Sequence, residues 1–132
     1  MIINDKEFLF EIGDAHFHCA MDITMNFVGG KWKTVVLWYL KNEKKRFTEL
    51  NKHIPQITER MLSITLRQLE EDGLILREVY NVKPPLKVEY SLTEFGQSLI
   101  PVLNEIAKWG RKVGKEKGKI IALDKLTTQT TK

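Results

Sequence analysis

The fold is decided by residues 46–73, which read RFTELNKHIPQITERMLSITLRQLEEDG. In the first part of this stretch Phe47, Leu50 and Ile54 recur at helical spacing and predict a short helix. Pro55 ends that helix, because the residue before a proline avoids the helical region of backbone space. The stretch therefore opens with a short helix and a tight turn.

The rest of the stretch predicts a longer amphipathic helix at about residues 58–72. Thr58 is a suitable N-cap, since its hydroxyl can accept a hydrogen bond from a first-turn amide, and Gly73 is a favoured residue just past a helix end. The buried stripe recurs at i, i+4 and i+7 and consists of Leu62, Leu66 and Leu69. A short helix, a turn and an amphipathic helix make a helix-turn-helix pattern.

The outer face of the longer helix carries side chains that suit the major groove of DNA. That groove admits one α-helix and presents a readable pattern of donors and acceptors. Arg60 and Arg67 lie two turns apart, so either can reach a guanine edge or a phosphate. The predicted DNA-facing residues are Thr58, Arg60, Met61, Ser63, Ile64, Thr65 and Arg67. The plain alternative is a solvated helix with two surface arginines.

A β-hairpin is predicted directly after this helix. LILREVY at 74–80 and VEYSLT at 88–93 alternate as strands do. The loop between them, about residues 81–87, holds two prolines, which cannot donate to a sheet ladder and so force an extended tip. Lys83 and Lys87 lie beside that tip and suit backbone phosphates or the minor groove, where contacts give affinity rather than sequence choice. The sequence thus predicts a wing.

The segment before the deciding stretch predicts a core helix at 31–40, KWKTVVLWYL, followed by a polar loop at 41–45. Lys31 and Lys33 flank Trp32 at the amino end of this helix. Both lysines can touch a phosphate, helped by the helix dipole. A solvated helix end fits the same residues equally well.

A final helix is predicted from Thr93, with a kink at Pro101. Its apolar stripe consists of Phe95, Leu99, Val102, Leu103, Ile106, Trp109 and Val113. A small domain does not readily bury so long an apolar face, so we expect this helix to dimerise.

The predicted fold class is mainly α with a small β-hairpin (α+β), a winged helix-turn-helix with N- and C-terminal dimerisation helices. We expect a helical N-terminal segment at 1–18, the winged domain with its dimerisation helix at 19–112, and a basic tail at 113–132. No apolar run approaches the roughly 18–20 residues of a membrane span, and the amino terminus is acidic where a signal peptide is basic. We therefore expect a cytoplasmic protein.

Charge is unevenly distributed along the 132 residues. Residues 1–30 hold one basic and five acidic side chains, a net of −4, whereas residues 31–93 and 94–132 each carry a net of +4. This distribution suits a polyanionic partner such as double-stranded DNA, although many basic proteins bind no nucleic acid.

Taken in order, these motifs resemble the HxlR-type branch of the MarR-like winged-helix regulators. The resemblance rests on Cys19, GGKWK at 29–33, RFTEL at 46–50, ERMLSITLRQLEEDGLI at 59–75, PP…VEYSLTEFG at 84–96 and SLIPVLNEIAKWG at 98–110. It covers about residues 19–112. It implies an intracellular homodimer that binds an operator and represses or activates nearby genes. Whether a small-molecule or oxidant effector controls it is left open by the sequence.

Cys19 is the single cysteine, so one chain can form no internal disulfide. The resemblance implies a redox-sensor role, since some relatives sense electrophiles or oxidants with a cysteine at this position and others do not. His16 and His18 lie beside it and can in principle activate the thiol. A metal site is the other interpretation of this cluster, but the residues are too closely spaced to wrap one ion. His53 fits a surface position. We expect no metal and no cofactor.

Two other classes of function compete with DNA binding. A winged helix can serve protein–protein contact without an operator, and then the charges of Arg60 and Arg67 would not matter to its activity. An enzyme is the second alternative, but no Gly-rich phosphate loop, catalytic triad order or metal motif is visible. We therefore expect no catalytic residues.

Overall fold

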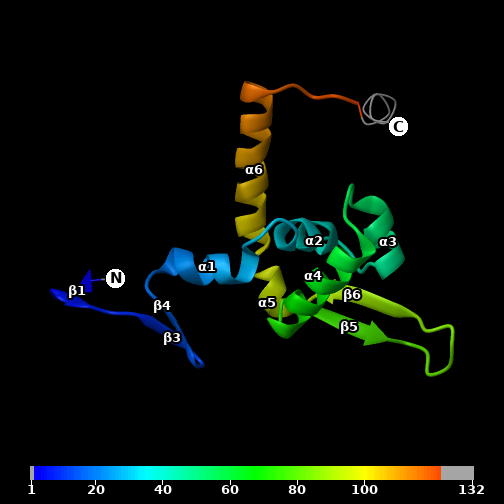
Figure 1. Cartoon of the computed structure of the whole chain (residues 1–132), viewed down its shortest axis with the longest axis horizontal. Coiled ribbons are helices and arrows are strands. Elements are labelled where there is room, and N and C mark those ends of the chain that lie inside the picture. Colours follow the sequence, from blue (N-terminus) through cyan, green and yellow to red (C-terminus); the bar gives the residue numbers. More distant parts are fainter. Residues whose placement is uncertain (1, 123–132) are drawn as a thin grey trace. The chain divides into compact units, whose positions relative to one another are not determined.

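The computed structural model describes residues 2–122, which fall into two compact units that meet in the sequence between Ser98 and Leu99. The first unit is shown in Figure 1 as the part labelled β1 to α5. Its elements are β1 (Ile2–Ile3), β2 (Lys6–Glu7), β3 (Phe10–Ile12), β4 (Ala15–Phe17), α1 (Ala20–Val28), α2 (Lys33–Leu40), α3 (Phe47–His53), α4 (Glu59–Glu71), β5 (Ile75–Val79), β6 (Val88–Leu92) and α5 (Glu94–Gln97). The second unit holds α6 (Ile100–Lys117). The predicted α+β class is confirmed.

The helix-turn-helix forms as predicted, with α3 and α4 packed against each other (Figure 1). Thr58 caps α4, its hydroxyl accepting a hydrogen bond from the Met61 N–H at 3.0 Å. The predicted stripe on α4, Leu62, Leu66 and Leu69, is buried. In the turn between the helices Gln56 takes a positive φ of 68°, a left-handed conformation that few side chains adopt.

The carboxyl end of α4 is a Schellman motif. Gly73 follows the helix with a φ of 76°, and its N–H donates to the carbonyl of Glu70. The Leu74 N–H donates to the carbonyl of Leu69. These two bonds satisfy the last carbonyls of the helix. Gly73 therefore ends α4 as predicted.

The core of the first unit lies where α2 and α3 pack on α4 and where the hairpin closes over them. The buried side of α2 is formed by Val36, Leu37 and Leu40, while Trp32 remains half-exposed at the start of the helix. Buried apolar side chains outside α2 and α4 include Leu50, Ile54, Ile57, Leu74 and Ile75.

Strands β5 and β6 pair antiparallel with Arg77 opposite Tyr90, and their connecting loop is the predicted wing (Figure 1). The polar loop before α3 also contributes to this sheet. Lys45 pairs with Tyr90 through two backbone hydrogen bonds of 3.0 and 2.8 Å. β6 therefore has a backbone partner on each side.

The predicted final helix is wrong in one respect, because it is two helices and not one kinked helix. Thr93 does cap α5, but that helix ends at Gln97, and α6 starts at Ile100 with Pro101 in its first turn. A proline lacks the N–H for a helical bond, and its ring collides with the carbonyl four residues earlier. Pro101 is accommodated where a helix begins, since first-turn amides have no helical partner.

The prediction of a helical segment at residues 1–18 is also wrong. Residues 2–17 form two short hairpins, β1 with β2 and β3 with β4, and helix α1 starts only at Ala20. Asn4 and Asp5 both have positive φ, which the favoured two-residue hairpin turn requires. Gly13, with a φ of 57°, opens the second turn. These turn residues override the weak apolar periodicity of the segment.

Candidate nucleic-acid interface

The outer face of α4 presents a polar and basic strip to solvent. Arg60, Ser63 and Arg67 are exposed, and they succeed one another at helical spacing on the side opposite the leucine stripe. Met61 is 38% exposed and Ile64 is half-buried. The cap residue Thr58 is exposed as well, although its hydroxyl is engaged with the Met61 N–H.

Thr65 does not belong to this strip. It is only 2% exposed, and its hydroxyl donates to the carbonyl of Met61 at 2.8 Å. The prediction that Thr65 faces DNA is therefore wrong. Thr65 lies three residues after Leu62 and four before Leu69, so helical spacing turns its side chain toward the leucine stripe, and its hydroxyl is satisfied within the helix.

Of the two lysines at the start of α2, only Lys31 is exposed. Its ammonium lies 4.8 Å from the centre of the Trp32 ring. Lys33 has an 18% exposed side chain that lies 3.9 Å from the carboxylate of Asp72 and 3.4 Å from the carbonyl of Asn26. Lys33 therefore joins α2 to the end of α4, and its ammonium is paired with the carboxylate of Asp72.

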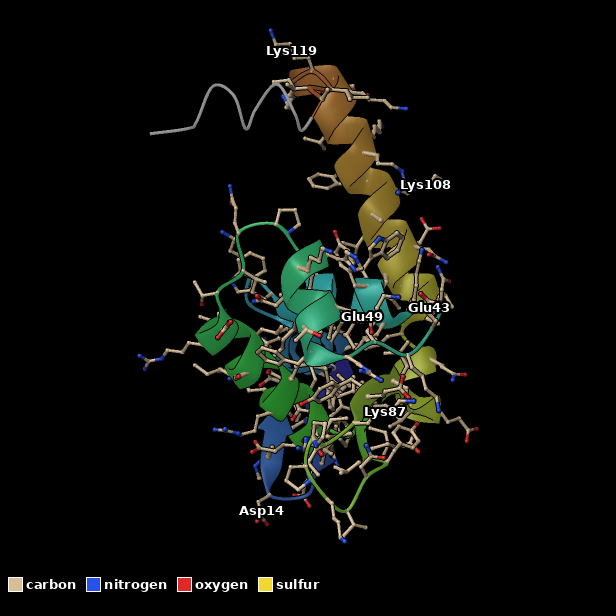
Figure 2. All side chains as sticks on the ribbon, turned by 90° about the vertical axis from the view of Figure 1, so that its right-hand side faces the viewer. Asp14, Glu43, Glu49, Lys87, Lys108 and Lys119 are labelled. Atoms are coloured by element: carbon tan, nitrogen blue, oxygen red, sulfur yellow. The ribbon has the colours of Figure 1, made fainter. Side chains whose placement is uncertain are left out.

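Lys83 is exposed on the wing, and Lys87 lies half-exposed at the base of the wing (Lys87 is labelled in Figure 2). The base is closed by the Tyr80 N–H, which donates to the carbonyl of Lys87 at 2.8 Å. The Lys87 ammonium lies 5.3 Å from the centre of the Tyr80 ring. At the tip, the Asn81 side-chain amide donates to the carbonyl of Pro85 at 3.2 Å.

A lysine from the loop before α3 holds this base from outside the hairpin. Lys44 donates to the Tyr80 hydroxyl at 3.1 Å and lies 3.5 Å from the carboxylate of Glu78. The hydrogen bond to Tyr80, followed by the charge of Glu78, raises the pKa of Lys44 above its ordinary value. Lys44 therefore links the loop before α3 to the base of the wing.

The same loop contains a second charged contact. Glu43, labelled in Figure 2, accepts a hydrogen bond from the Lys45 ammonium at 2.7 Å. That hydrogen bond and the charge of Lys45 lower the pKa of Glu43 from its ordinary value of 4.5. Because the Lys45 backbone pairs with Tyr90, the ion pair sits at the edge of the wing sheet.

Two residues that were not predicted from the sequence lie beside the polar and basic strip of α4. Arg77 on β5 and Tyr90 on β6 line a shallow pocket together with Ser63, Leu66, Arg67 and Glu70 of α4. The signal in the sequence was the position of Arg77 on the same strand face as Ile75, which is buried under α4. Arg77 comes two residues after Ile75 on the same face of the strand, so its side chain is expected to lie at the edge of α4.

The predicted dimerisation residues do not form one stripe. Phe95 lies on α5 and contacts Phe27 edge-on, with ring centres 5.4 Å apart. On α6 three residues at helical spacing are largely exposed, Val102 at 39%, Ile106 at 46% and Trp109 at 69%. Val113 continues this face half-exposed, Leu103 is buried, and Leu99 is the half-exposed N-cap of α6.

Cys19 is half-buried and occupies the N-cap position of α1. The histidines beside it are turned toward carboxylates, His16 to Glu11 at 2.9 Å and His18 to Asp22 at 3.2 Å. Between residues 2 and 122 no three histidine, cysteine or carboxylate side chains gather as a metal site would need. His53 is exposed at the end of α3. Within the same described range, every helix is too short or too polar to span a bilayer.

Residues 27–118 match a protein family described as HxlR-like helix-turn-helix. Among curated proteins, an HTH-type transcriptional regulator of Methanothermobacter thermautotrophicus is 51% identical over 104 residues, 79% of each chain. The HTH-type transcriptional regulator YdeP of Bacillus subtilis is 53% identical over 94 residues, 71% of this chain and 73% of that one.

Solved structures agree in fold and sequence. The redox regulator HypR in its reduced form has a TM-score of 0.68 and 44% identity, covering 72% of this chain and 93% of that one. Its oxidised form has a TM-score of 0.67 and 43% identity, covering 78% and 100%. Residues 2–17, with their two hairpins, precede the family match.

Proposed function

The chain belongs to the HxlR-like helix-turn-helix family and is a transcriptional regulator rather than an enzyme, and from this premise we propose that it binds a two-fold operator as a homodimer. One observation carries the proposal. Helix α4 buries Leu62, Leu66 and Leu69 on one side and exposes Arg60 and Arg67 on the other. A helix anchored in this way can enter the major groove while its packing against the core stays intact.

Within this proposal, Arg60, Met61, Ser63, Ile64 and Arg67 face the groove, and Thr58 lies at the helix end near the backbone. Lys83 and Lys87 contact backbone phosphates or the minor groove from the wing, and Lys31 adds a phosphate contact. Lys33 contributes less because Asp72 lies beside its ammonium.

The exposed face of α6 supports the homodimer. Val102, Ile106 and Trp109 succeed one another on one side of the helix and are exposed to different degrees, Trp109 most at 69%. Contiguous apolar side chains on a helix mark a surface for another protein. A second copy that presents the same face gives the closed two-fold interface most common among oligomers.

A thiol signal is a second function that a specific observation favours. Cys19 is half-buried and not part of the core, and two similar structures are the reduced and oxidised forms of a redox regulator. With one cysteine per chain, oxidation by diamide would join Cys19 of two copies. The two thiols lose two protons and two electrons, and the azo group of diamide is reduced to a hydrazine.

Footprinting of the purified protein on the DNA upstream of its own gene tests the main proposal. Protection is expected as two half-sites about one helical turn, or a multiple, apart. No protection on any fragment, with the protein shown to be folded, would contradict operator binding and favour a protein–protein contact module.

The same footprint repeated with diamide tests the thiol signal. Wild-type protection is expected to change on oxidation and to return with a reductant, while Cys19→Ser protection stays constant. An equal response in both proteins would remove Cys19 as the sensor and leave operator binding untouched.

A further inference from the structure

A shallow pocket of about 160 Å³ lies between α4 and the wing sheet, on the side of α4 that leads to the wing. Its lining residues are Ser63, Leu66, Arg67, Glu70, Arg77 and Tyr90. We propose that this pocket binds one phosphate of the DNA backbone. Arg67 of α4, the recognition helix of the proposed complex, and Arg77 of the sheet would both contact that phosphate. The inference rests on the proposed function, since it takes α4 to lie in the major groove.

Both arginines are available to an anion. Arg67 and Arg77 are exposed, and neither forms an ion pair with any residue between 2 and 122. Two guanidinium groups that line one pocket repel each other unless an anion lies between them. The planar fork of a guanidinium matches the oxygens of a phosphate in two-point hydrogen bonds. The hydroxyls of Ser63 and Tyr90 add neutral donors to the same lining.

The floor of the pocket is held rigidly by backbone pairing. Arg77 lies directly opposite Tyr90 in the β5–β6 register, so their side chains share one face of the sheet. The other edge of Tyr90 is bonded to Lys45 in both directions, at 3.0 and 2.8 Å. Arg77 therefore projects from the middle of a paired strand and not from the loop that forms the wing tip.

The position of Arg67 along α4 favours a phosphate over a base. Residues near the amino end of a recognition helix reach base edges, and Arg60 lies in the first turn of α4. Arg67 lies two turns further on, beside a strand that cannot enter the groove with the helix. A backbone phosphate at the groove wall is the DNA group that both arginines can share. Contacts of this kind set register and affinity and carry no sequence information.

Glu70 is the single carboxylate among the residues that line this pocket. Its charge opposes an anion and weakens the site without abolishing it. This gives the site two variants of opposite effect, Arg77→Gln and Glu70→Gln, neither of which alters the core.

Titrations of the operator duplex and of a scrambled duplex of equal length, over a series of salt concentrations, test the site. Arg77→Gln is expected to weaken binding to both duplexes by the same factor and to reduce the slope of log K against log salt by less than about 1, because Arg67 still faces the phosphate. Arg77→Lys keeps the charge and is expected to restore most of the slope. The double variant Arg67→Gln/Arg77→Gln is expected to lose about 1 in slope, because both side chains neutralise one phosphate. A loss of about 2 would mean two separate phosphates and would overturn the shared site.

Two matched variants complete the design. Arg111→Gln makes the same charge change on α6, outside the pocket, and is expected to leave both affinities and the slope unchanged. Glu70→Gln is expected to tighten binding to both duplexes. If Arg77→Gln selectively lowers the preference for the operator, or leaves both affinities unchanged while the variant remains folded, the phosphate site is wrong. If the wild-type protein itself shows no operator preference, the proposed function fails, and the salt slopes on either duplex still decide the site.

Discussion

The Thr93 hydroxyl donates a hydrogen bond to the carbonyl oxygen of Gly73 at 2.6 Å, and it accepts one from the Gly96 N–H at 3.0 Å. Gly73 ends α4, and Thr93 is the cap of α5. The Thr93 N–H also donates to the carbonyl of Leu74 at 3.1 Å. Thr93 therefore links the carboxyl end of α4 to the segment between β6 and α5.

Replacing Thr93 by Val removes both hydroxyl hydrogen bonds while keeping the shape of the side chain. We expect the free energy of unfolding to fall by about 1–2 kcal/mol, the usual cost of losing a cap or a hydrogen bond. Urea unfolding followed by circular dichroism measures the change. Thr48→Val is the matched control, since Thr48 is exposed on α3, and its effect should stay within about 0.5 kcal/mol. Equal losses in the two variants would contradict the role of Thr93.

Gly96 is required by space rather than by backbone angle. A Cβ atom at Gly96 would collide with the carbonyl oxygen of Leu74. Gly96→Ala is therefore expected to lower the free energy of unfolding by about 1–3 kcal/mol, as overpacking does. Gly110→Ala on α6, where an added Cβ meets nothing within 4 Å, should instead stabilise by up to about 1 kcal/mol. Thermal unfolding of both variants checks the opposite signs.

Arg60 is expected to read a base. Arg60→Ala should weaken operator binding by about 1–3 kcal/mol and affect a scrambled duplex much less. Fluorescence anisotropy with both duplexes measures the difference. Arg111→Ala removes the same charge from α6 and should change neither affinity. A loss at Arg60 that is equal on the two duplexes would assign this side chain to the backbone instead.

The exposed face of α6 predicts the oligomeric state. Ile106→Glu places a charge within the apolar face formed by Val102, Ile106 and Trp109 and is expected to shift the protein from dimer to monomer, because burying an unpaired charge is costly. Sedimentation velocity at micromolar concentration measures this. Asn104→Glu adds the same side chain on the opposite side of the helix, where the residue is already exposed, and should leave the dimer intact. A dimer that survives Ile106→Glu would place the interface elsewhere.

The Glu43–Lys45 ion pair predicts a small acid dependence of stability. The pKa of Glu43 is lowered in the folded protein, so its contribution is present above the ordinary value of 4.5 and is lost as the pH falls through the folded value. The melting temperature of Glu43→Gln should lie slightly below that of the wild type near neutral pH and converge with it in acid. Glu105→Gln, on an exposed position of α6, should show no such convergence. Parallel curves at all pH values would contradict the ion pair.

The helix-turn-helix was predictable because its signals are local and agree with one another. The Thr58 cap, the leucine stripe and Gly73 each specify the same helix, and each is found in its expected role. The wing strands were predictable for the same reason. Thr65 is the exception, because residue type and approximate helix face do not decide which hydroxyl donates a hydrogen bond to the backbone of its own helix.

The errors at the two ends have different causes. At the amino end the turn residues Asn4, Asp5 and Gly13 are the decisive signal, because their positive φ values suit hairpin turns and not a helix. At the other end the predicted single helix ends at Gln97 and a second helix starts at Ile100, with Pro101 in its first turn. The pairing of Arg77 with Tyr90, and the pocket they form with α4, depend on strand register and tertiary packing, which a single sequence does not fix.

The closed base of the wing makes its tip a replaceable part. A backbone hydrogen bond of 2.8 Å joins Tyr80 to Lys87. Beyond it Val82 is 98% exposed, so this apolar side chain of the tip is not part of the core. Lengthening a surface loop costs little free energy. Loops of other lengths and compositions can therefore be grafted between these two residues, and the protein can serve as a scaffold in which the wing is redesigned while the recognition helix keeps its place.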